Sequence, residues 1–413
     1  MAGDVRRPRV GLTIIELLVS LAVVSIVLAA VMTVVVAITR QRRDGGNQVE
    51  VRLNGRVALA QMQFDGANAG FRFGTAPLAV RVLQNLTGGE PEIVDANTDC
   101  GGQPGWTVQP ETDVIEFRQG ADGRAPGKVT SGAGCGAACS VVLNNTAYWN
   151  PLGLPSEGEG QILFFSNGIT GCVGRLVTQV SSSNNLKMLK ANLRTDAVAT
   201  NYPMAGAGAC PNNGMTVTLL DTVTRYVVCR PPNATNANLR PVLFRQVLVA
   251  GPAGGPNLVP RPPPAGQWER VQDGVEDLQV ATMLDNQSAL VSGGGCTGTG
   301  AGARCWCNAA VGADCTGYNP DPTSAAGALN GAVGAPAAER SATLARAFRV
   351  AVTTVALRAS GYGDKRDFVR PASLDHVVGV LDLSTPYGRA LAASQRVVAE
   401  TTLVPQNIVM VIP

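Results

Sequence analysis

The sequence predicts an α+β protein in which one long N-terminal helix precedes an antiparallel, β-rich body. Residues 17–39 carry no charged side chain, and about 20 apolar residues in a helix are enough to cross the hydrocarbon core of a bilayer. The chain has 48 glycines, 26 prolines and only 5% aromatic residues, a composition more typical of strands and turns than of a helical bundle.

The charge balance argues against a protein that binds polyanions. The chain has 33 basic and 30 acidic residues, a net charge of +3, and no basic tract follows residue 43. We therefore expect no nucleic-acid partner. A length of 413 residues is enough for one large or two modest folded units.

A short basic stretch with Arg6, Arg7 and Arg9 precedes the apolar segment. These arginines predict that the N-terminus stays in the cytoplasm and that the rest of the chain lies outside, although the basic residues 40–43 weaken the asymmetry. No small-residue cleavage pattern follows the apolar segment, so we expect the segment to stay in the protein. An uncleaved signal anchor is the simplest reading, but it leaves the carboxylate of Glu16 at the start of the apolar run without a reason.

The helix is expected to continue outside the membrane over residues 40–68. Five apolar residues at spacings of 4, 4, 3 and 4 form what we call the outer stripe: Val49, Leu53, Val57, Ala60 and Phe64. This spacing predicts one apolar face, which we expect to pack against a sheet of the body. Arg52 and Arg56 fall on another face. Gly45 and Gly46 are expected to kink or loosen the helix.

The chain after residue 70 has the pattern of short strands between Gly-, Pro- and Asn-rich connections. The strand-like runs are 113–119, 161–166, 175–180, 215–220, 224–229, 241–249 and 346–360. Residues 120–160, 250–266 and 292–340 are expected to be long loops, two of which contain cysteines that could hold them together.

All ten cysteines follow the apolar segment: Cys100, Cys135, Cys139, Cys172, Cys210, Cys229, Cys296, Cys305, Cys307 and Cys315. An even number on one side of a membrane segment predicts disulfides in an oxidising compartment. The alternative is a zinc site built on the Cys-Trp-Cys run at 305–307. Pairing between Cys135 and Cys139, or within 296–315, would close local loops, but the connectivity stays open.

An acidic cluster lies in the run "DGVEDL". Asp273, Glu276 and Asp277 supply the oxygens that Ca²⁺ prefers, but acids at the start of a helix or turn, exposed to solvent, explain them more simply. We expect no metal there.

No catalytic pattern is present in the chain. It contains no G-x-S-x-G, no H-E-x-x-H, no P-loop lysine and no dinucleotide fingerprint, and its only histidine is His376. We expect His376 to be structural, the protein not to be an enzyme, and no cofactor to be bound.

The stretch "GLTIIELLVSLAVVSIVL", which starts at Gly11, resembles the class III signal of type IV prepilins and pseudopilins. The resemblance implies that residues 1–11 are a leader peptide, that prepilin peptidase cuts between Gly11 and Leu12, and that Leu12 is then N-methylated. Leu12 is a departure, because phenylalanine is commoner at this position in the family. Residues 12–39 would be the transmembrane and filament-core half of the helix.

The resemblance also implies a role in assembly for Thr13 and Glu16. Glu16 would be the fifth residue of the mature chain. In a filament its carboxylate would face the ammonium of Leu12 in a neighbouring subunit, where opposite charges attract strongly at low dielectric. The alternative is that Glu16 lies at headgroup level and reaches water.

Three later segments, 223–246, 271–280 and 345–360, resemble PilW-type minor pilins and share related patterns with GspJ-type pseudopilins. Residues 396–408 only loosely follow the family's C-terminal strand. The resemblance implies a pilin-like roll: a long, partly transmembrane helix packed on an antiparallel β-rich globular domain, here residues 70–413, with long disulfide-stapled loops.

The function implied is that of a minor pilin of the tip or priming complex of a type IV pilus. Its partners would be prepilin peptidase, other minor and major pilins, and a PilY-type tip adhesin. It would first span the inner membrane with its C-terminal domain in the periplasm, and later lie at the pilus tip. Motility, adhesion and DNA uptake are not distinguished. The alternatives are a GspJ-like pseudopilin of a type II secretion system and an uncleaved, signal-anchored surface protein that binds a ligand.

Overall fold

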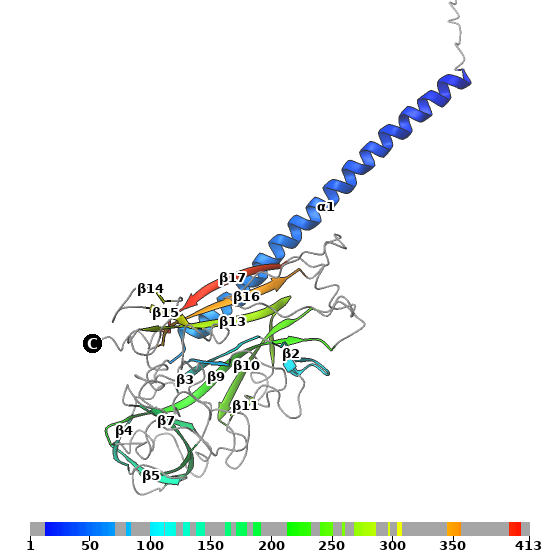
Figure 1. Cartoon of the computed structure of the whole chain (residues 1–413). Helices are drawn as coiled ribbons and strands as arrows, with labels where there is room; N and C mark the ends of the chain where they lie inside the picture. Colours follow the sequence, from blue (N-terminus) through cyan, green and yellow to red (C-terminus); the bar gives the residue numbers. More distant parts are fainter. Residues whose placement is uncertain are drawn as a thin grey trace, which may run out of the picture.

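The computed structural model consists of one long helix that leads into a β-rich body (Figure 1). The residues that the structure describes are 13–70, 80–83, 100–110, 112–120, 127–132, 138–144, 162–166, 171–179, 185–190, 213–232, 240–250, 258–260, 268–285, 296–297, 304–307, 345–356 and 396–405. The α+β layout expected from the sequence is confirmed at this level: an N-terminal apolar helix, antiparallel sheets and a disulfide.

Helix α1 (Ile14–Ala67) is 54 residues long and runs without interruption through Gly45 and Gly46. The kink or loosening expected at these glycines therefore does not interrupt the helix. A glycine costs a helix interior only about 1 kcal/mol relative to alanine, which is too little to interrupt a helix whose far end is held by the body. The helix ends at Ala67, and the backbone N–H of Ala69 then donates to the carbonyl of Gly66 at 3.1 Å.

The sheet next to α1 has five antiparallel strands in the order β14-β15-β13-β16-β17. Their bounds are Cys296–Thr297, Arg304–Cys307, Val275–Asp285, Ala345–Val355 and Arg396–Leu403. The outer half of α1 contacts β17, β16 and β12 (Glu269–Asp273). Strand β17 lies beside the end of the helix that enters the body in Figure 1.

The larger sheet has twelve strands and is organised around β9 (Thr216–Arg230). The second half of β9 pairs with β3 (Val114–Gly120) and β10 (Val242–Ala250). Four short strands complete this part: β1 (Val80–Leu83), β2 (Thr107–Val108), β11 (Leu258–Pro260) and β12.

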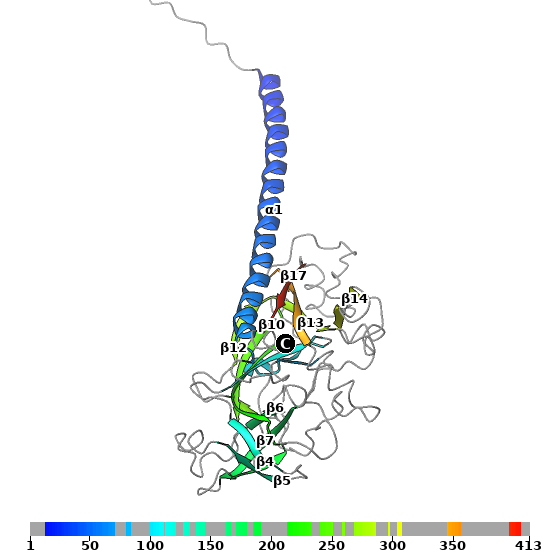
Figure 2. The same ribbon diagram turned by 90° about the vertical axis from the view of Figure 1, so that its left-hand side faces the viewer.

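The first half of β9 belongs to a closed ring of strands. The ring runs from β9 through β4, β5, β8, β7 and β6 and returns to β9. The other five strands are β4 (Gly127–Gly132), β5 (Ala138–Leu143), β6 (Ile162–Ser166), β7 (Gly171–Gln179) and β8 (Asn185–Lys190). Figures 1 and 2 place the ring at the end of the body that is farthest from the N-terminal half of α1.

The main hydrophobic core lies between α1 and the two sheets. It combines Leu59 and Met62 of the helix with side chains from both sheets, such as Phe117, Tyr226 and Phe348, all at most 5% exposed. One core thus joins the helix to both sheets, and the direction in which α1 leaves the body depends on this packing.

Each strand-like run of the sequence contains a strand in the structure, and 215–220 and 224–229 merge into the single strand β9; the ends of the runs 175–180 and 346–360 lie outside the described residues. The expected loops are wrong in part. Strands β4 and β5 lie within 120–160, β11 lies within 250–266, and β14 and β15 lie within 292–340. These strands are short and their own sequences do not predict them, so their pairing with neighbouring strands must stabilise them: β4 with β9, β5 with β4 and β8, β11 with β10, β15 with β13, and β14 with β15.

Candidate functional site on the N-terminal helix

The first turn of α1 carries a capping box made by Thr13 and Glu16. The Glu16 backbone N–H donates to Thr13 Oγ1 at 3.3 Å, and the Thr13 backbone N–H donates to Glu16 Oε2 at 3.0 Å. The two residues satisfy each other's polar groups at the exposed helix start. The spacing Thr-x-x-Glu before an apolar run could have predicted this partnership from sequence. The Glu16 carboxylate thus has a local partner in its own helix.

The inner half of α1 is apolar and exposed on all sides. Every residue from Ile14 to Ile38 is exposed, and the most apolar window of the helix is 0% buried by the body. By length and composition the helix could cross a membrane, a test that a signal sequence would also pass. Its exposure separates it from a core helix of a soluble protein, which would be covered by its own chain.

The outer half of α1 packs on the sheet through Val51, Ala58, Leu59 and Met62, all at most 5% exposed. The Thr354 hydroxyl in β16 donates to the Val51 carbonyl at 2.9 Å.

Two glycines bring the helix close to the strands. A Cβ on Gly55 would lie 2.9 Å from Ala399 Cβ, and one on Gly66 would lie 3.2 Å from the Phe117 ring. Neither position has room for an added side-chain atom without a shift of its neighbours, so the helix backbone lies directly against side chains of the strands there.

The outer stripe is not the packed face, and the expectation that it contacts the sheet is wrong. Val49 and Phe64 are each 67% exposed, Leu53 is 58% exposed and Val57 is 44% exposed. With 3.6 residues per turn, the stripe and the packed face point in directions about 180° apart. The packed face combines small residues, which allow close approach, with one carboxylate that has partners in the body. The outer half of α1 is therefore apolar on two opposite faces.

The carboxylate of the packed face is Asp65, in the last turn of α1. Its Oδ2 lies 2.8 Å from Nε of Arg245, its Oδ1 accepts from a terminal nitrogen of Arg245 at 3.2 Å, and the Tyr226 hydroxyl donates to Oδ2. Arg245 also contacts Glu269 at 3.0 Å. The group of Asp65, Tyr226, Arg245 and Glu269, which we call the helix lock, joins α1 to β9, β10 and β12.

Two groups of the helix lock, the Tyr226 phenol and the Arg245 guanidinium, have raised pKa values. Burial raises the pKa of the Tyr226 phenol well above its usual range, and the nearby Asp65 carboxylate raises it further. Burial by itself lowers the pKa of Arg245, but the hydrogen bond and the charge of Asp65 outweigh it, and the pKa is raised. Sequence reasoning missed this group because its partners come from distant parts of the chain.

The acidic cluster lies on strands and not at a solvated helix or turn start. Strand β12 of the larger sheet passes into β13 of the five-stranded sheet through Gly274, which has φ 73°. Glu276 is buried and pairs with Arg396 at 2.6 Å, Asp277 is buried, and Asp273 pairs with Arg270. The expectation of solvated acids is wrong, because Glu276 and Asp277 lie inside the packed sheet. Within the described ranges, no group of three His, Cys, Asp or Glu residues could hold a metal ion.

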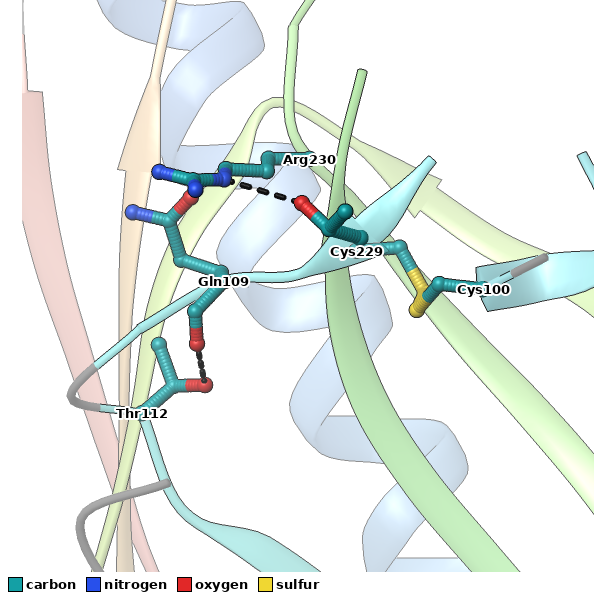
Figure 3. Close-up of a disulfide and its surroundings, with 6 residues drawn as sticks. Cys100, Gln109, Thr112, Cys229 and Arg230 are labelled. Atoms are coloured by element: carbon teal, nitrogen blue, oxygen red, sulfur yellow. Dashed lines mark hydrogen bonds between the residues drawn. A yellow bond between two sulfur atoms is a disulfide. The ribbon is translucent and has the colours of Figure 1, made fainter. Parts of the chain in front are cut away.

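One disulfide joins Cys100 to Cys229, across 129 residues (Figure 3). It tethers the turn before β2 to the end of β9 in a small core with Phe244, against which Trp106 and Trp268 pack edge-on. The disulfide prediction is thus confirmed for this pair, which is not one of the local loops.

The other cysteines are placed only in part. Cys139 and Cys172 lie in β5 and β7, and the backbone of Cys296 in β14 lies opposite Cys305 in β15, two residues before Cys307. The remaining predicted positions lie outside the described residues: Cys135, Cys210, Cys315 and His376.

Gly11 and Leu12 also lie outside the described residues, so the cleavage site stays a prediction. Comparison of the chain with family models, with curated proteins and with solved structures found no match. The functional inference therefore depends on the signal-like N-terminal sequence, the exposed inner half of the helix and the packing of its outer half on the body.

Proposed function

We propose that this chain is a pilin-like subunit of an envelope filament, in the manner of a PilW-type minor pilin at the tip or in the priming complex of a type IV pilus. The observation that carries the proposal is a helix whose inner half is apolar and fully uncovered by its own body, directly after the Gly-Leu-Thr-x-x-Glu signal. Such a surface needs lipid or other apolar helices around it. A subunit that waits in the inner membrane and then joins a helical bundle meets both conditions.

The shape of the body supports a position at the tip. The body packs on the outer half of α1, and its strand ring lies at the end of the body that is farthest from the inner half of the helix (Figures 1 and 2). A large body of this kind would crowd its neighbours if it were repeated along a shaft. Other minor and major pilins, prepilin peptidase and a PilY-type adhesin are the partners that this role implies.

In this proposal the Glu16 carboxylate pairs with the Leu12 ammonium of a neighbouring subunit after cleavage. Glu16 also takes part in the capping box, so an experiment must separate its capping role from its charge-pairing role. Glutamine at the third helical position also satisfies a capping box. Glu16→Gln therefore keeps the cap and removes the charge, whereas Thr13→Ala weakens the cap and keeps the charge.

We expect Glu16→Gln to be cleaved normally but to be lost from sheared filaments by about tenfold or more, because an ammonium left without its partner at low dielectric is costly. Thr13→Ala should enter filaments at close to the wild-type level. Equal incorporation of Glu16→Gln and wild type would limit Glu16 to capping and remove the charge-pairing role.

The direct test of the proposal is mass spectrometry of the mature N-terminus, with protein purified from cell envelopes. A peptide that begins at N-methylated Leu12 is expected. An intact Met1 or Ala2 terminus in a strain that has prepilin peptidase would contradict the proposal and favour an uncleaved, anchored surface protein.

A GspJ-like role in a secretion pseudopilus is the second candidate, because both pilin classes require the same N-terminal signal. Affinity purification of the cross-linked full chain separates them. Recovery of type IV pilus subunits supports the first role, and recovery of type II secretion components supports the second.

A further inference from the structure

Three arginines follow directly on the uncharged apolar segment of α1. They are Arg40, Arg42 and Arg43, which we call the arginine collar; the first two are exposed and Arg43 is half-buried. Basic residues usually gather on the cytoplasmic side of a membrane segment, whereas the orientation expected from the basic residues at 6–9 puts the collar on the outer side. The collar therefore opposes the orientation of the chain, and its presence needs another physical reason.

The length of the apolar segment places the collar at the level of the lipid phosphates. Residues 17–39 span about 34 Å at 1.5 Å per residue, slightly more than the roughly 30 Å of the hydrocarbon core of a bilayer. When this segment crosses the bilayer, Arg40 lies at the outer boundary of the core and Arg43 lies about 5 Å farther out. Long arginine side chains reach the headgroups from such positions.

The collar points to more than one side of the helix. With 3.6 residues per turn, Arg42 is rotated by about 200° from Arg40, and Arg43 by about 300°. The first residue of α1 that the body buries is Asn47, about one turn beyond Arg43. Lipid headgroups on opposite sides of the helix can therefore contact the collar.

The collar has no negative partner in the described part of its own chain. Asp44 and Glu50 are the nearest acids in the outer half of α1, and neither forms an ion pair with a collar arginine within the described ranges. Residues 57–413 carry 25 basic and 26 acidic side chains, whereas residues 40–56 carry five basic and two acidic ones. The excess of positive charge beyond the membrane segment thus lies where the helix leaves the bilayer, and the nearly neutral body does not offset it.

We propose that the arginine collar binds the phosphate groups of anionic phospholipids, of the phosphatidylglycerol class, in the outer leaflet of the membrane that α1 crosses. Guanidinium groups pair with phosphate oxygens in a planar, bidentate geometry, and each basic residue near an anionic membrane surface adds a favourable electrostatic contribution. A protein ligand would have to bring acidic side chains to the membrane surface, where lipid phosphates are already present. The site rests on the membrane span of the proposed function, but it requires neither cleavage at Gly11 nor contact with another subunit.

The test measures which phospholipid lies beside the outer end of the membrane segment. The full chain carries Val35→Trp, because Val35 is 50% exposed, lies about 6 Å inside the core boundary at Thr39, and points within about 20° of Arg42. After reconstitution into vesicles, brominated phosphatidylglycerol and brominated phosphatidylcholine quench the fluorescence from position 35, and mixtures give the relative binding constant of the two lipids. The chain without Val35→Trp supplies the background from the four native tryptophans. We expect phosphatidylglycerol to be preferred about fivefold or more.

Charge removal identifies the residues that carry the preference. Substitution of all three collar arginines by glutamine should lower the preference to about one, and unchanged total quenching by the two lipids would show that this variant still spans the bilayer. Arg52→Gln with Arg56→Gln is the matched control. Both arginines are exposed on the same helix, but Arg52 lies about 20 Å beyond the core boundary, which is two Debye lengths at about 0.1 M salt. The control should keep the wild-type preference.

Four results would overturn the proposal: equal binding of the two lipids, an unchanged preference without the collar arginines, an equal loss in the Arg52 and Arg56 control, or a loss caused by inorganic phosphate but not by sodium chloride at the same ionic strength. The last result would make free phosphate the ligand. Equal quenching by both lipids rejects only the lipid site. Quenching by neither lipid rejects the site together with the membrane span of the proposed function, and the mature N-terminal peptide tests the prepilin pathway independently.

Discussion

The two apolar faces of the outer half of α1 differ in burial although they belong to the same helix. One face, with Val51, Leu59 and Met62, is buried against the sheet. The opposite face, the outer stripe, is exposed although its side chains are at least as apolar. Hydrophobicity alone therefore does not decide which face of a helix packs against its own domain.

The two faces differ in the size of their side chains and in the presence of one carboxylate, Asp65, on the packed face. Gly55 and Gly66 let the helix backbone lie directly against the side chains of Ala399 and Phe117, whereas the larger side chains of the outer stripe would hold a sheet farther away. The helix lock adds a specific contact, because Asp65 lies on the packed face, where Arg245 and Tyr226 are its partners. Small residues and one matched carboxylate thus select the face, and the bulkier apolar face stays exposed.

The largest effect is expected from the carboxylate of the packed face. Asp65→Ala leaves the Arg245 guanidinium, 21% exposed, without its main partner, and should lower the free energy of unfolding by about 3–5 kcal/mol. Glu269→Ala is the control, because Glu269 contacts the same arginine but is 62% exposed and should cost less than about 1 kcal/mol. Urea unfolding of the full chain in detergent, followed by tryptophan fluorescence, measures both. Equal losses would show that Asp65 is not the group that holds the helix.

A truncation on each face compares the two directly. Met62 is 0% exposed, so Met62→Ala should cost about 2–5 kcal/mol through lost burial and a cavity. Phe64 is 67% exposed, and Phe64→Ala should change the free energy of unfolding by no more than about 0.5 kcal/mol. The same unfolding assay applies. A larger loss for Phe64→Ala than for Met62→Ala would mean that the helix packs by its outer stripe after all.

Adding one methyl group at two glycines should give effects of opposite sign. Gly55→Ala places a Cβ 2.9 Å from Ala399 Cβ, an overpacking cost of about 1–3 kcal/mol that exceeds the gain of up to about 1 kcal/mol in helix propensity. Gly45→Ala meets nothing within 4 Å and should stabilise the helix by up to about 1 kcal/mol. Circular dichroism during heating of the full chain reports both. Stabilisation by Gly55→Ala would contradict the close approach.

The smallest effect is a pH dependence at the helix lock. Burial and the Asp65 carboxylate raise the pKa of Tyr226, whereas a tyrosine in the unfolded chain ionises near pH 10. The unfolded state therefore loses this proton first, and stability that is present below about pH 10 should fall above it, by at most about 1.4 kcal/mol per pH unit. Unfolding measured between pH 9 and 11 should show a shallower decline for Tyr226→Phe. Identical slopes for wild type and variant would mean that Tyr226 does not stay protonated.

Much of the local structure could be predicted from the sequence. The apolar run and its outer continuation predict a helix to about residue 68, and α1 ends at Ala67. The strand runs 113–119 and 241–249 became β3 and β10. The short strands β4 and β8 could not be predicted, because their order comes from neighbours in the strand ring and not from their own composition.

In the candidate site, too, some features follow from the sequence and others only from the tertiary structure. The sequence by itself determined that the N-terminus begins an uncovered apolar helix with Thr13 and Glu16 at its start, since capping and helix formation depend on residues a few positions apart. Only the tertiary structure decided which outer face is buried. That choice depends on partners of Asp65 that lie 161 and 180 residues away in sequence, at Tyr226 and Arg245, and no local pattern contains such distances.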